Sequence, residues 1–269
     1  TRTGCAATWS MTTTISTAMR IDLKRRLGLA VGALIAMTLP AVAGICEKRQ
    51  HDGQGYVICT LSAAQEPGLN LWLNGPDGQI LGDFTAVRRN LPLGQVLGFA
   101  MNAGMYHADY SPVGLYVSNG KKSHDLVSGA SNDNFGMLPN GVFCTGGARP
   151  YQVIESRAFA KSQPQCRIAT QSGPMLVIDG ALHPRFLVDS DSRYIRNGVG
   201  VSPDGQTAWF AISDRAVTFH EFGRLFRDGL GVRDALYFDG SISRLYAPAL
   251  NRADFGRRLG PIIGYTEQE

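Results

Sequence analysis

The chain has 269 residues, of which 44% are hydrophobic and 18% are charged, a composition that suits one large domain with a hydrophobic core. Its formal net charge of +4 comes from residues 1–43, which hold five basic residues and one acidic residue, so the remainder holds 21 of each. A neutral remainder excludes the basic surface that a nucleic-acid-binding protein needs.

Residues 19–43 have the pattern of a secretory signal peptide. A basic cluster at 24–26 precedes an apolar run at 27–39, and an Ala-Val-Ala cleavage site follows. The apolar run is shorter than the roughly 20 residues of a transmembrane helix, so we expect no stable membrane span after cleavage, with an uncleaved anchor as the alternative. We interpret residues 1–18 as an upstream extension that is not native mature sequence, and residues 44–269 as a periplasmic or secreted domain.

Four cysteines follow the leader: Cys46, Cys59, Cys144 and Cys166. An even number in an exported chain predicts disulfides, for which three connectivities are possible. We favour Cys46–Cys59 and Cys144–Cys166, because each bond closes a short loop. No cluster of cysteine and histidine indicates zinc, and we predict no cofactor. Calcium held by carboxylate and carbonyl oxygens stays open, so the metal requirement is unknown at this point.

Short apolar runs rich in strand formers, separated by turns of glycine, proline and asparagine, dominate the rest of the chain. In chain order, we predict strands at 55–61, 69–73, 95–101, 112–118, 141–144, 175–178, 198–202, 207–212 and 235–238. Helices are expected at 151–159 and at 217–228, where Phe219, Phe222 and Phe226 share one face. Strand and helix do not alternate regularly, so we predict an α+β fold: one domain, with a mixed β-sheet and a few packed helices.

Polar residues lie beside glycine at the ends of several predicted strands. These groups are Asn102, Gln171-Ser172, Arg196-Asn197 and Asp239-Gly240-Ser241. Glycine lets a ligand approach the backbone closely, so the groups are candidate binding residues, although each alone is also an ordinary turn. His107 joins them because it follows the Asn102 loop directly.

Signatures of other common enzyme classes are missing. The chain contains no G-x-S-x-G elbow, no phosphate-binding glycine loop that ends in Lys-Ser or Lys-Thr, and no H-E-x-x-H. Their absence disfavours common serine hydrolases, nucleotide-binding folds and zinc proteases.

Five segments of the chain resemble the bacterial phosphodiester glycosidase family, which is related to the mannose 6-phosphate uncovering enzyme. They are FAMNAGMYHADYSPVGLYVSNGK (99–121), NFGMLPNGVF (134–143), QSGPMLV (171–177), RNGVGVSPDG (196–205) and ALYFDGSISRLY (235–246). Each segment is short and rich in glycine, but their order and joint presence over about 56–265 make the resemblance specific.

The resemblance implies a set of substrate-binding residues. The family's asparagine-glycine loop matches 102–104, its arginine and glycine stretch matches 196–200, and its aspartate turn begins at Asp239. Together with the candidates chosen above from their positions, the expected substrate-binding residues are Asn102, Gly104, His107, Gln171, Ser172, Arg196, Asn197, Gly240 and Ser241. Many members have Asp-Gly-Gly-Gly-Ser where this chain has Asp-Gly-Ser-Ile-Ser, a departure that leaves the substrate open.

The activity implied by the resemblance is hydrolysis of the glycosidic bond of a sugar-1-phosphodiester of the GlcNAc-1-phosphate type, which releases free sugar and a phosphomonoester. A phosphate monoester is a weak base, so its departure needs little acid assistance, and one carboxylate with a cationic clamp is sufficient. We assign the carboxylate role to Asp239, with Glu221 as a second candidate that a helix-surface position would also explain. Arg196 is the expected phosphate clamp.

Two alternatives remain open at the level of sequence. A phosphodiesterase would cut the P–O bond, although the metal-binding clusters such enzymes often use are missing. A non-catalytic protein could bind exopolysaccharide or cell-wall glycan through the same loops, with Tyr106, Tyr110 and Tyr194 stacking on sugar rings.

Overall fold

The computed structural model describes residues 45–131, 133–239 and 242–269, all within one compact unit, Val42–Glu269. The upstream extension and signal peptide expected at 1–43, and the candidate residues Gly240 and Ser241, lie outside the described residues. No helix in the described part of the chain is long and apolar enough to cross a membrane.

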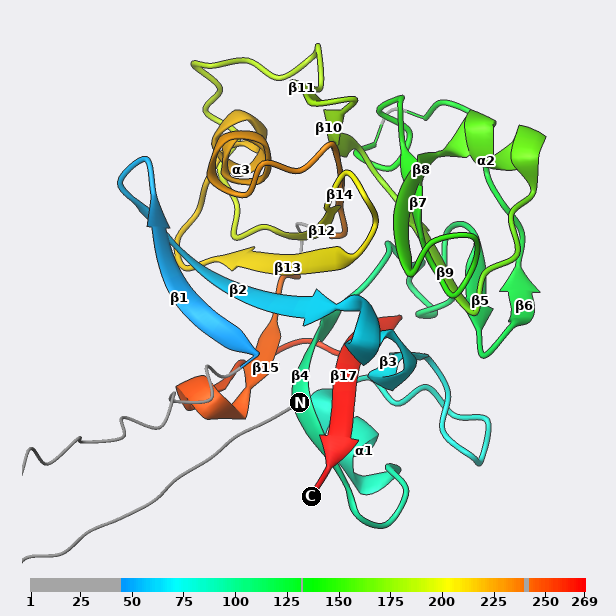
Figure 1. Cartoon of the computed structure of the whole chain (residues 1–269). Coiled ribbons are helices and arrows are strands. Elements are labelled where there is room, and N and C mark those ends of the chain that lie inside the picture. The colour runs from blue at the N-terminus through cyan, green and yellow to red at the C-terminus, as the bar shows by residue number, and fades with distance from the viewer. Residues whose placement is uncertain (1–44, 132, 240–241) are drawn as a thin grey trace, which may run out of the picture. The chain divides into compact units, whose positions relative to one another are not determined.

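The strands form three sheets, which Figure 1 shows together with the helices. The first sheet has the order β1 (Cys46–His51), β2 (Gln54–Ser62), β13 (Thr207–Ser213), β12 (Asn197–Val201), β14 (Asp234–Tyr237), β10 (Met175–Ile178) and β11 (Ala181–Leu182). The second has the order β16 (Arg252–Ala253), β15 (Leu245–Ala247), β4 (Gln95–Asn102), β17 (Ile262–Gln268) and β3 (Leu69–Trp72). The third has the order β6 (Lys121–His124), β5 (Tyr116–Ser118), β9 (Ile168–Ser172), β7 (Gly141–Thr145) and β8 (Tyr151–Glu155).

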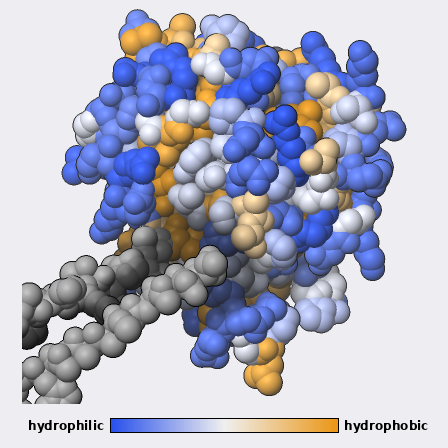
Figure 2. Space-filling model, viewed as in Figure 1, coloured by the Kyte–Doolittle hydropathy of each residue, from blue (hydrophilic) through white to orange (hydrophobic). Residues whose placement is uncertain are grey.

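One aromatic ring from each sheet meets in the main core. Phe99 of β4 lies 5.2 Å from Phe210 of β13, and Phe143 of β7 lies 5.6 Å from the same ring, measured between ring centroids. All three side chains are fully buried. Large rings bury the most apolar area per residue, so this contact holds the three sheets against one another. Hydrophilic residues cover most of the face seen in Figure 2.

The helices are short and cover the sheets from outside. They are α1 (Phe84–Arg89), α2 (Ser156–Ser162) and α3 (Phe219–Arg224), with a π turn at Leu225–Gly229 and 3-10 turns at Ala63–Gly68 and Pro248–Leu250. Phe222 and Phe226 are buried against the first sheet, as the amphipathic pattern predicted. Gly200 of β12 is required there, because a Cβ atom would lie 2.6 Å from the Phe226 ring.

The α+β class with few helices is confirmed, and several details differ from the expectation. The strands divide among three sheets, and every pairing between the described strands is antiparallel. The helix expected at 151–159 is wrong in its first half, which forms β8 paired with β7. Helix α2 begins only after Glu155, whose side chain accepts a hydrogen bond from the Ala158 N–H at 2.9 Å.

Both predicted disulfides are confirmed. Cys46 and Cys59 face each other across β1 and β2, and Cys144 of β7 joins Cys166 in the segment that leads into β9. The first bond links residues 13 positions apart, and the second links residues 22 positions apart.

We expect that replacing Cys144 and Cys166 together by alanine lowers the free energy of unfolding by about 3 kcal/mol, because the unfolded chain loses a closed loop. Urea unfolding of the oxidised wild type and the double variant, followed by circular dichroism, measures this difference. A loss below about 0.5 kcal/mol would contradict the expectation, and addition of a reductant to the variant controls for the remaining bond.

Candidate active site

A cavity of about 380 Å³ opens where β4 and β14 end. Its described lining residues are Met105, Tyr106, His107, Val113, Asp133, Asn134, Phe135, Asp239 and Ile242. Two candidates from the sequence, His107 and Asp239, therefore meet in one place. Asp239 is only 9% exposed, so its carboxylate lies at a largely dry strand end.

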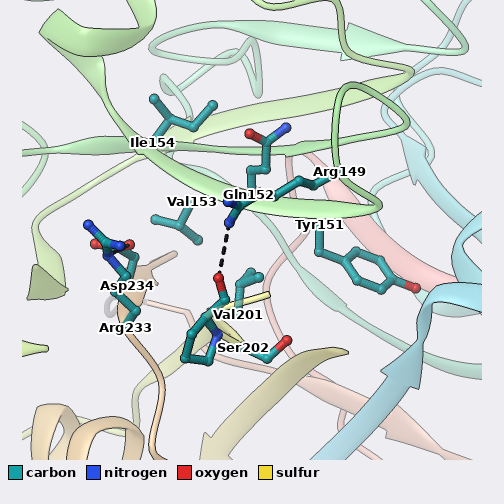
Figure 3. A pocket seen from close by; sticks show the side chains of 10 residues that line it. Arg149, Tyr151, Gln152, Val153, Ile154, Val201, Ser202, Arg233 and Asp234 are labelled. Carbon is teal, nitrogen blue, oxygen red and sulfur yellow. Dashed lines mark hydrogen bonds and ion pairs between the residues drawn. The ribbon is translucent and has the colours of Figure 1, made fainter. Parts of the chain in front are cut away.

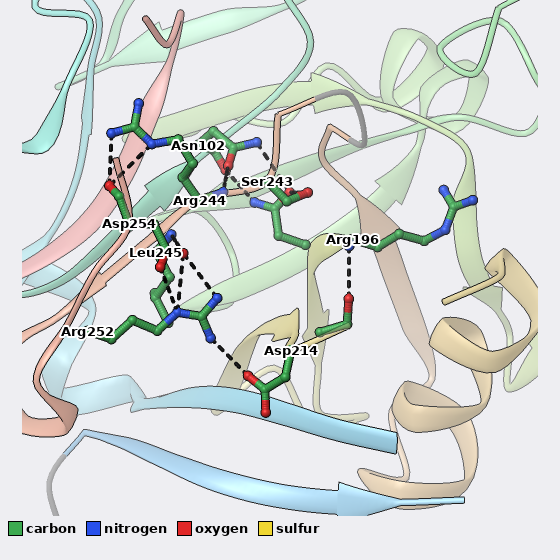
Figure 4. A network of polar contacts seen from close by, with 10 residues as sticks. Asn102, Arg196, Asp214, Ser243, Arg244, Leu245, Arg252 and Asp254 are labelled. Atoms are coloured by element: carbon green, nitrogen blue, oxygen red, sulfur yellow. Dashed lines mark hydrogen bonds and ion pairs between the residues drawn. The ribbon is translucent and has the colours of Figure 1, made fainter. Parts of the chain in front are cut away.

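A pair of buried asparagines, of which Figure 4 labels Asn102, holds the strand ends together. The Asn102 side chain donates to Asn197 Oδ1 at 3.2 Å, and the Asn197 side chain donates to the Asn102 carbonyl at 2.7 Å. Asn102 Oδ1 accepts from the Arg244 N–H at 2.9 Å. Because β4 belongs to the second sheet and β12 to the first, these bonds fix the two sheets at the cavity.

The same asparagine fixes the backbone that carries Asp239. Asn197 Oδ1 accepts from the Ser243 hydroxyl at 3.2 Å and, at the long distance of 3.5 Å, from the Asp239 N–H. The single proton of the Ser243 hydroxyl is shared with the Asp239 carbonyl, which is the nearer acceptor at 2.6 Å. Ser172 donates to the carbonyl of Phe238. Asn197 and Ser172 thus hold the Asp239 strand end, and neither is among the lining residues.

Gly104 and Gln171 lie where the loop that follows β4 packs against strand β9 of the third sheet. A Cβ atom on Gly104 would collide with the Gln171 carbonyl and lie 2.6 Å from Thr170 Oγ1, so only glycine fits against β9. The Gln171 side chain accepts from the N–H groups of Leu115 and Val127, each at 3.0 Å. Both residues were expected to bind substrate, and the structure gives both a structural contact.

Arg196 does not line the cavity. Its guanidinium donates to the Val217 carbonyl at 2.9 Å and to the Ser192 carbonyl at 3.0 Å, and its Cζ atom lies 3.7 Å from the Phe219 ring centroid. The residue is fully buried, and Figure 4 shows its side chain running away from Asn102. The Arg196 guanidinium is therefore used in buried structural contacts, while the next residue, Asn197, bonds to Asn102 beside the cavity.

Glu221 lies in the first turn of α3 and is not among the residues that line the cavity. Its carboxylate accepts from Arg193 in two bonds of 2.9 Å and from the Thr218 N–H at 2.8 Å. This capping box starts the helix and occupies both carboxylate oxygens. Glu221 thus caps helix α3 and lies outside the described lining of the cavity.

Asp133 supplies the second carboxylate of the cavity, and sequence reasoning missed it. Hydrogen bonds from the Ser131 hydroxyl at 2.6 Å and the Gly136 N–H at 2.9 Å hold the pKa of its carboxyl below the usual value. The group is therefore ionised at neutral pH. The available signal was its position directly before the Asn134-Phe135 motif.

Tyr106, in the loop that follows β4, lines the cavity. Burial, and then the nearby Asp239 carboxylate, raise the pKa of its hydroxyl to about 12. The hydroxyl donates to the Arg258 carbonyl at 3.2 Å, and the Tyr110 ring stacks on Tyr106 at 5.9 Å between centroids. The neutral hydroxyl thus joins the cavity to the loop that carries Arg258.

Another cavity, shown in Figure 3, lies beside β8 and holds about 260 Å³. Arg149 of its lining donates to the Pro203 carbonyl at 3.0 Å, and Arg233 pairs with Asp179. None of the candidates from the sequence lines this cavity. Across the described ranges, no group of three or more histidine, cysteine, aspartate or glutamate side chains is placed to hold a metal ion.

We expect that Gly104→Ala destabilises the protein by about 1–3 kcal/mol, because the added methyl group collides with β9. Gly129→Ala is the matched control, since a Cβ atom at that glycine meets no atom within 4 Å. Thermal unfolding of both variants measures the effect, and equal melting temperatures would contradict the close approach.

Arg196→Ala should lower the free energy of unfolding by about 3 kcal/mol or more, because buried acceptors lose a charged donor. Arg193→Ala in the same loop removes only a partly exposed ion pair and should cost less than about 1 kcal/mol. Denaturant unfolding compares the two variants. A stable Arg196→Ala protein that loses only affinity for phosphate-bearing ligands would restore the clamp interpretation.

Comparison with known proteins gives consistent findings. The family model for phosphodiester glycosidase matches residues 96–265, more than half of the chain. A protein of Escherichia coli (strain K12), described as uncharacterized protein YigE, is 33% identical over 182 residues, which cover 68% of this chain and 70% of that protein.

A solved structure shares the fold. It is the catalytic domain of zebrafish N-acetylglucosamine-1-phosphodiester alpha-N-acetylglucosaminidase, auto-inhibited by its pro-peptide, which matches with a TM-score of 0.57 over 83% of this chain and 82% of that chain. At 12% identity this likeness shows the fold alone. With the family match over 96–265 and the ordered motifs around the cavity, the chain belongs to the phosphodiester glycosidase family.

Proposed function

We propose that the protein is an exported hydrolase that cleaves the glycosidic bond of a sugar-1-phosphodiester of the GlcNAc-1-phosphate type. Free sugar and a phosphomonoester are the products. The observation that carries the proposal is the cavity in which the family's aspartate, Asp239, lies with a second carboxylate, Asp133. Two disulfides support a periplasmic or secreted location, because disulfides persist in oxidising compartments.

The leaving group decides what the cavity has to supply. A phosphomonoester leaves as a stable anion, so a protonated acid beside the scissile oxygen is of minor importance. The developing positive charge on the sugar ring needs negative charge nearby. An ionised Asp133, held in that form by Ser131 and Gly136, supplies it.

Asp239 acts as the nucleophile or as the base that activates water. Its backbone is fixed by Asn197 and Ser243, so the carboxylate is held in position before the substrate enters. His107 and Asn134 line the same cavity and provide polar groups for the sugar hydroxyls. Phe135 and Ile242 provide the apolar wall.

Glycan binding without turnover is the competing function, and the tyrosines favour it less than the sequence suggested. The Tyr106 ring lies against the backbone at Gly260, and Tyr110 stacks on it, so these rings use part of their surface on each other. Tyr194 is 52% exposed, but it lies beside Arg196, outside the lining of the cavity.

We expect that Asp239→Asn reduces kcat at least ~100-fold while the melting temperature stays within a few degrees, because the amide keeps the shape and loses the charge. The assay uses a GlcNAc-1-phosphodiester in oxygen-18 water with the mature protein from residue 44. Label in the released sugar, with unlabelled phosphomonoester, is the expected result for cleavage of the sugar C–O bond.

The variants Asp133→Asn and Glu221→Gln test whether turnover depends on the second carboxylate of the cavity or on the helix-capping carboxylate. The first should lose turnover and the second should retain most of it. Label in the phosphate would mean cleavage of the P–O bond and would overturn the proposal. Binding of the diester without turnover, unchanged in Asp239→Asn, would establish the glycan-binding alternative.

A further inference from the structure

The cavity has negative charge where an anionic substrate has to bind. Asp133 and Asp239 line it, and no arginine or lysine is among the lining residues that the structure describes. A phosphodiester carries a negative charge of its own, which two carboxylates repel. Arg196, the cation expected for this task, is buried on the other side of β12. If an arginine binds the phosphate, it therefore comes from outside these described lining residues.

The loop Asp254–Arg258 runs beside the wall of the cavity. Tyr106, a lining residue, donates its hydroxyl hydrogen bond to the Arg258 carbonyl at 3.2 Å. The Tyr106 ring also lies directly against the backbone at Gly260, where a Cβ atom would collide with it. Tyr106 of the cavity wall thus contacts the loop at Arg258 and the chain that follows the loop at Gly260.

A buried arginine fixes the backbone of this loop. Arg244, which is 7% exposed, donates to the Arg257 carbonyl at 2.6 Å and to the Asp254 carbonyl at 2.9 Å. Arg244 also lowers the pKa of Tyr106, which opposes the larger effect of burial. The loop is therefore held in one conformation by a group that is itself enclosed, which limits the entropy lost when a ligand binds.

The side chains of the loop differ in how they are used. Arg257 is exposed, and its guanidinium has no hydrogen-bond or ion-pair partner within the described ranges. Arg258 lies over the Tyr110 ring at 5.4 Å and donates to the Ile80 carbonyl at 2.6 Å. The one acid of the loop, Asp254, is paired with Arg252 at 3.0 Å. The guanidinium groups of Arg257 and Arg258 are thus not paired with a carboxylate of the loop.

We propose that this loop is the phosphate subsite of the enzyme, with Arg257 as the principal ligand and Arg258 as the second. The inference rests on the proposed function and adds to it the residues that bind the leaving group. Guanidinium groups bind phosphate oxygens through paired, charge-assisted hydrogen bonds. Arg258 and Tyr110 form a planar surface that accommodates the group attached beyond the phosphate.

The test compares Arg257→Ala with Arg157→Ala, an exposed arginine of α2 that also has no partner within the described ranges. Each variant is assayed on a GlcNAc-1-phosphodiester and on a neutral 4-nitrophenyl glycoside of the same sugar. For Arg257→Ala we expect KM for the diester to rise about tenfold, with kcat changed less than twofold and with the neutral glycoside unaffected. The rise of KM with added salt should also be smaller than in the wild type.

Binding of methyl phosphate, measured by calorimetry, separates this inference from the proposed function. If the wild type turns over no diester, the proposed function fails, and a tenfold weaker binding of methyl phosphate by Arg257→Ala alone still supports the subsite. Equal affinities in Arg257→Ala, Arg157→Ala and wild type would overturn it, as would an equal rise in KM for both substrates. An Arg257→Lys variant that recovers at least half of the lost affinity confirms that charge is responsible.

Discussion

The amide pair of Asn102 and Asn197 is the contact on which the active site depends. One partner ends a strand of the second sheet and the other begins a strand of the first, and both are buried where water cannot replace a lost bond. Each unpaired amide in such a place would cost about 1–3 kcal/mol. The strand ends are therefore fixed relative to each other, and they determine the position of Asp239.

The sequence was a good guide to elements and to the cysteines, and the reasons are local. Phe222 of α3 and Phe226 of the π turn that continues it lie at helical spacing, and the Pro203-Asp204-Gly205 turn joins β12 to β13 as a hairpin. Which strands pair over long separations was not accessible, because an apolar run such as that of β4 has no mark that selects β15 and β17 as neighbours.

Part of the candidate site was predicted from the sequence. Some of the errors follow from the alternation of side chains between the two faces of a strand. Asp239 and His107 meet because each follows the end of a strand that reaches the same cavity. Arg196-Asn197 and Gln171-Ser172 are neighbouring pairs in extended chain, so only one member of each can face the site. That rule was available from the sequence alone. Asp133 was not, since it lies in a loop whose course depends on Ser131 and Gly136.

The two faces of strand β9 therefore have different structural roles. Gln171 ties the segments around Leu115 and Val127 to the third sheet, while Ser172 holds the strand end beside Asp239. A shift of one residue in pairing would place the Thr170 hydroxyl where the Gln171 amide is needed and the Gln171 amide where the Ser172 hydroxyl is needed. Insertions and deletions in this strand are consequently far less tolerable than in the turns nearby, and any redesign of the third sheet has to preserve its length.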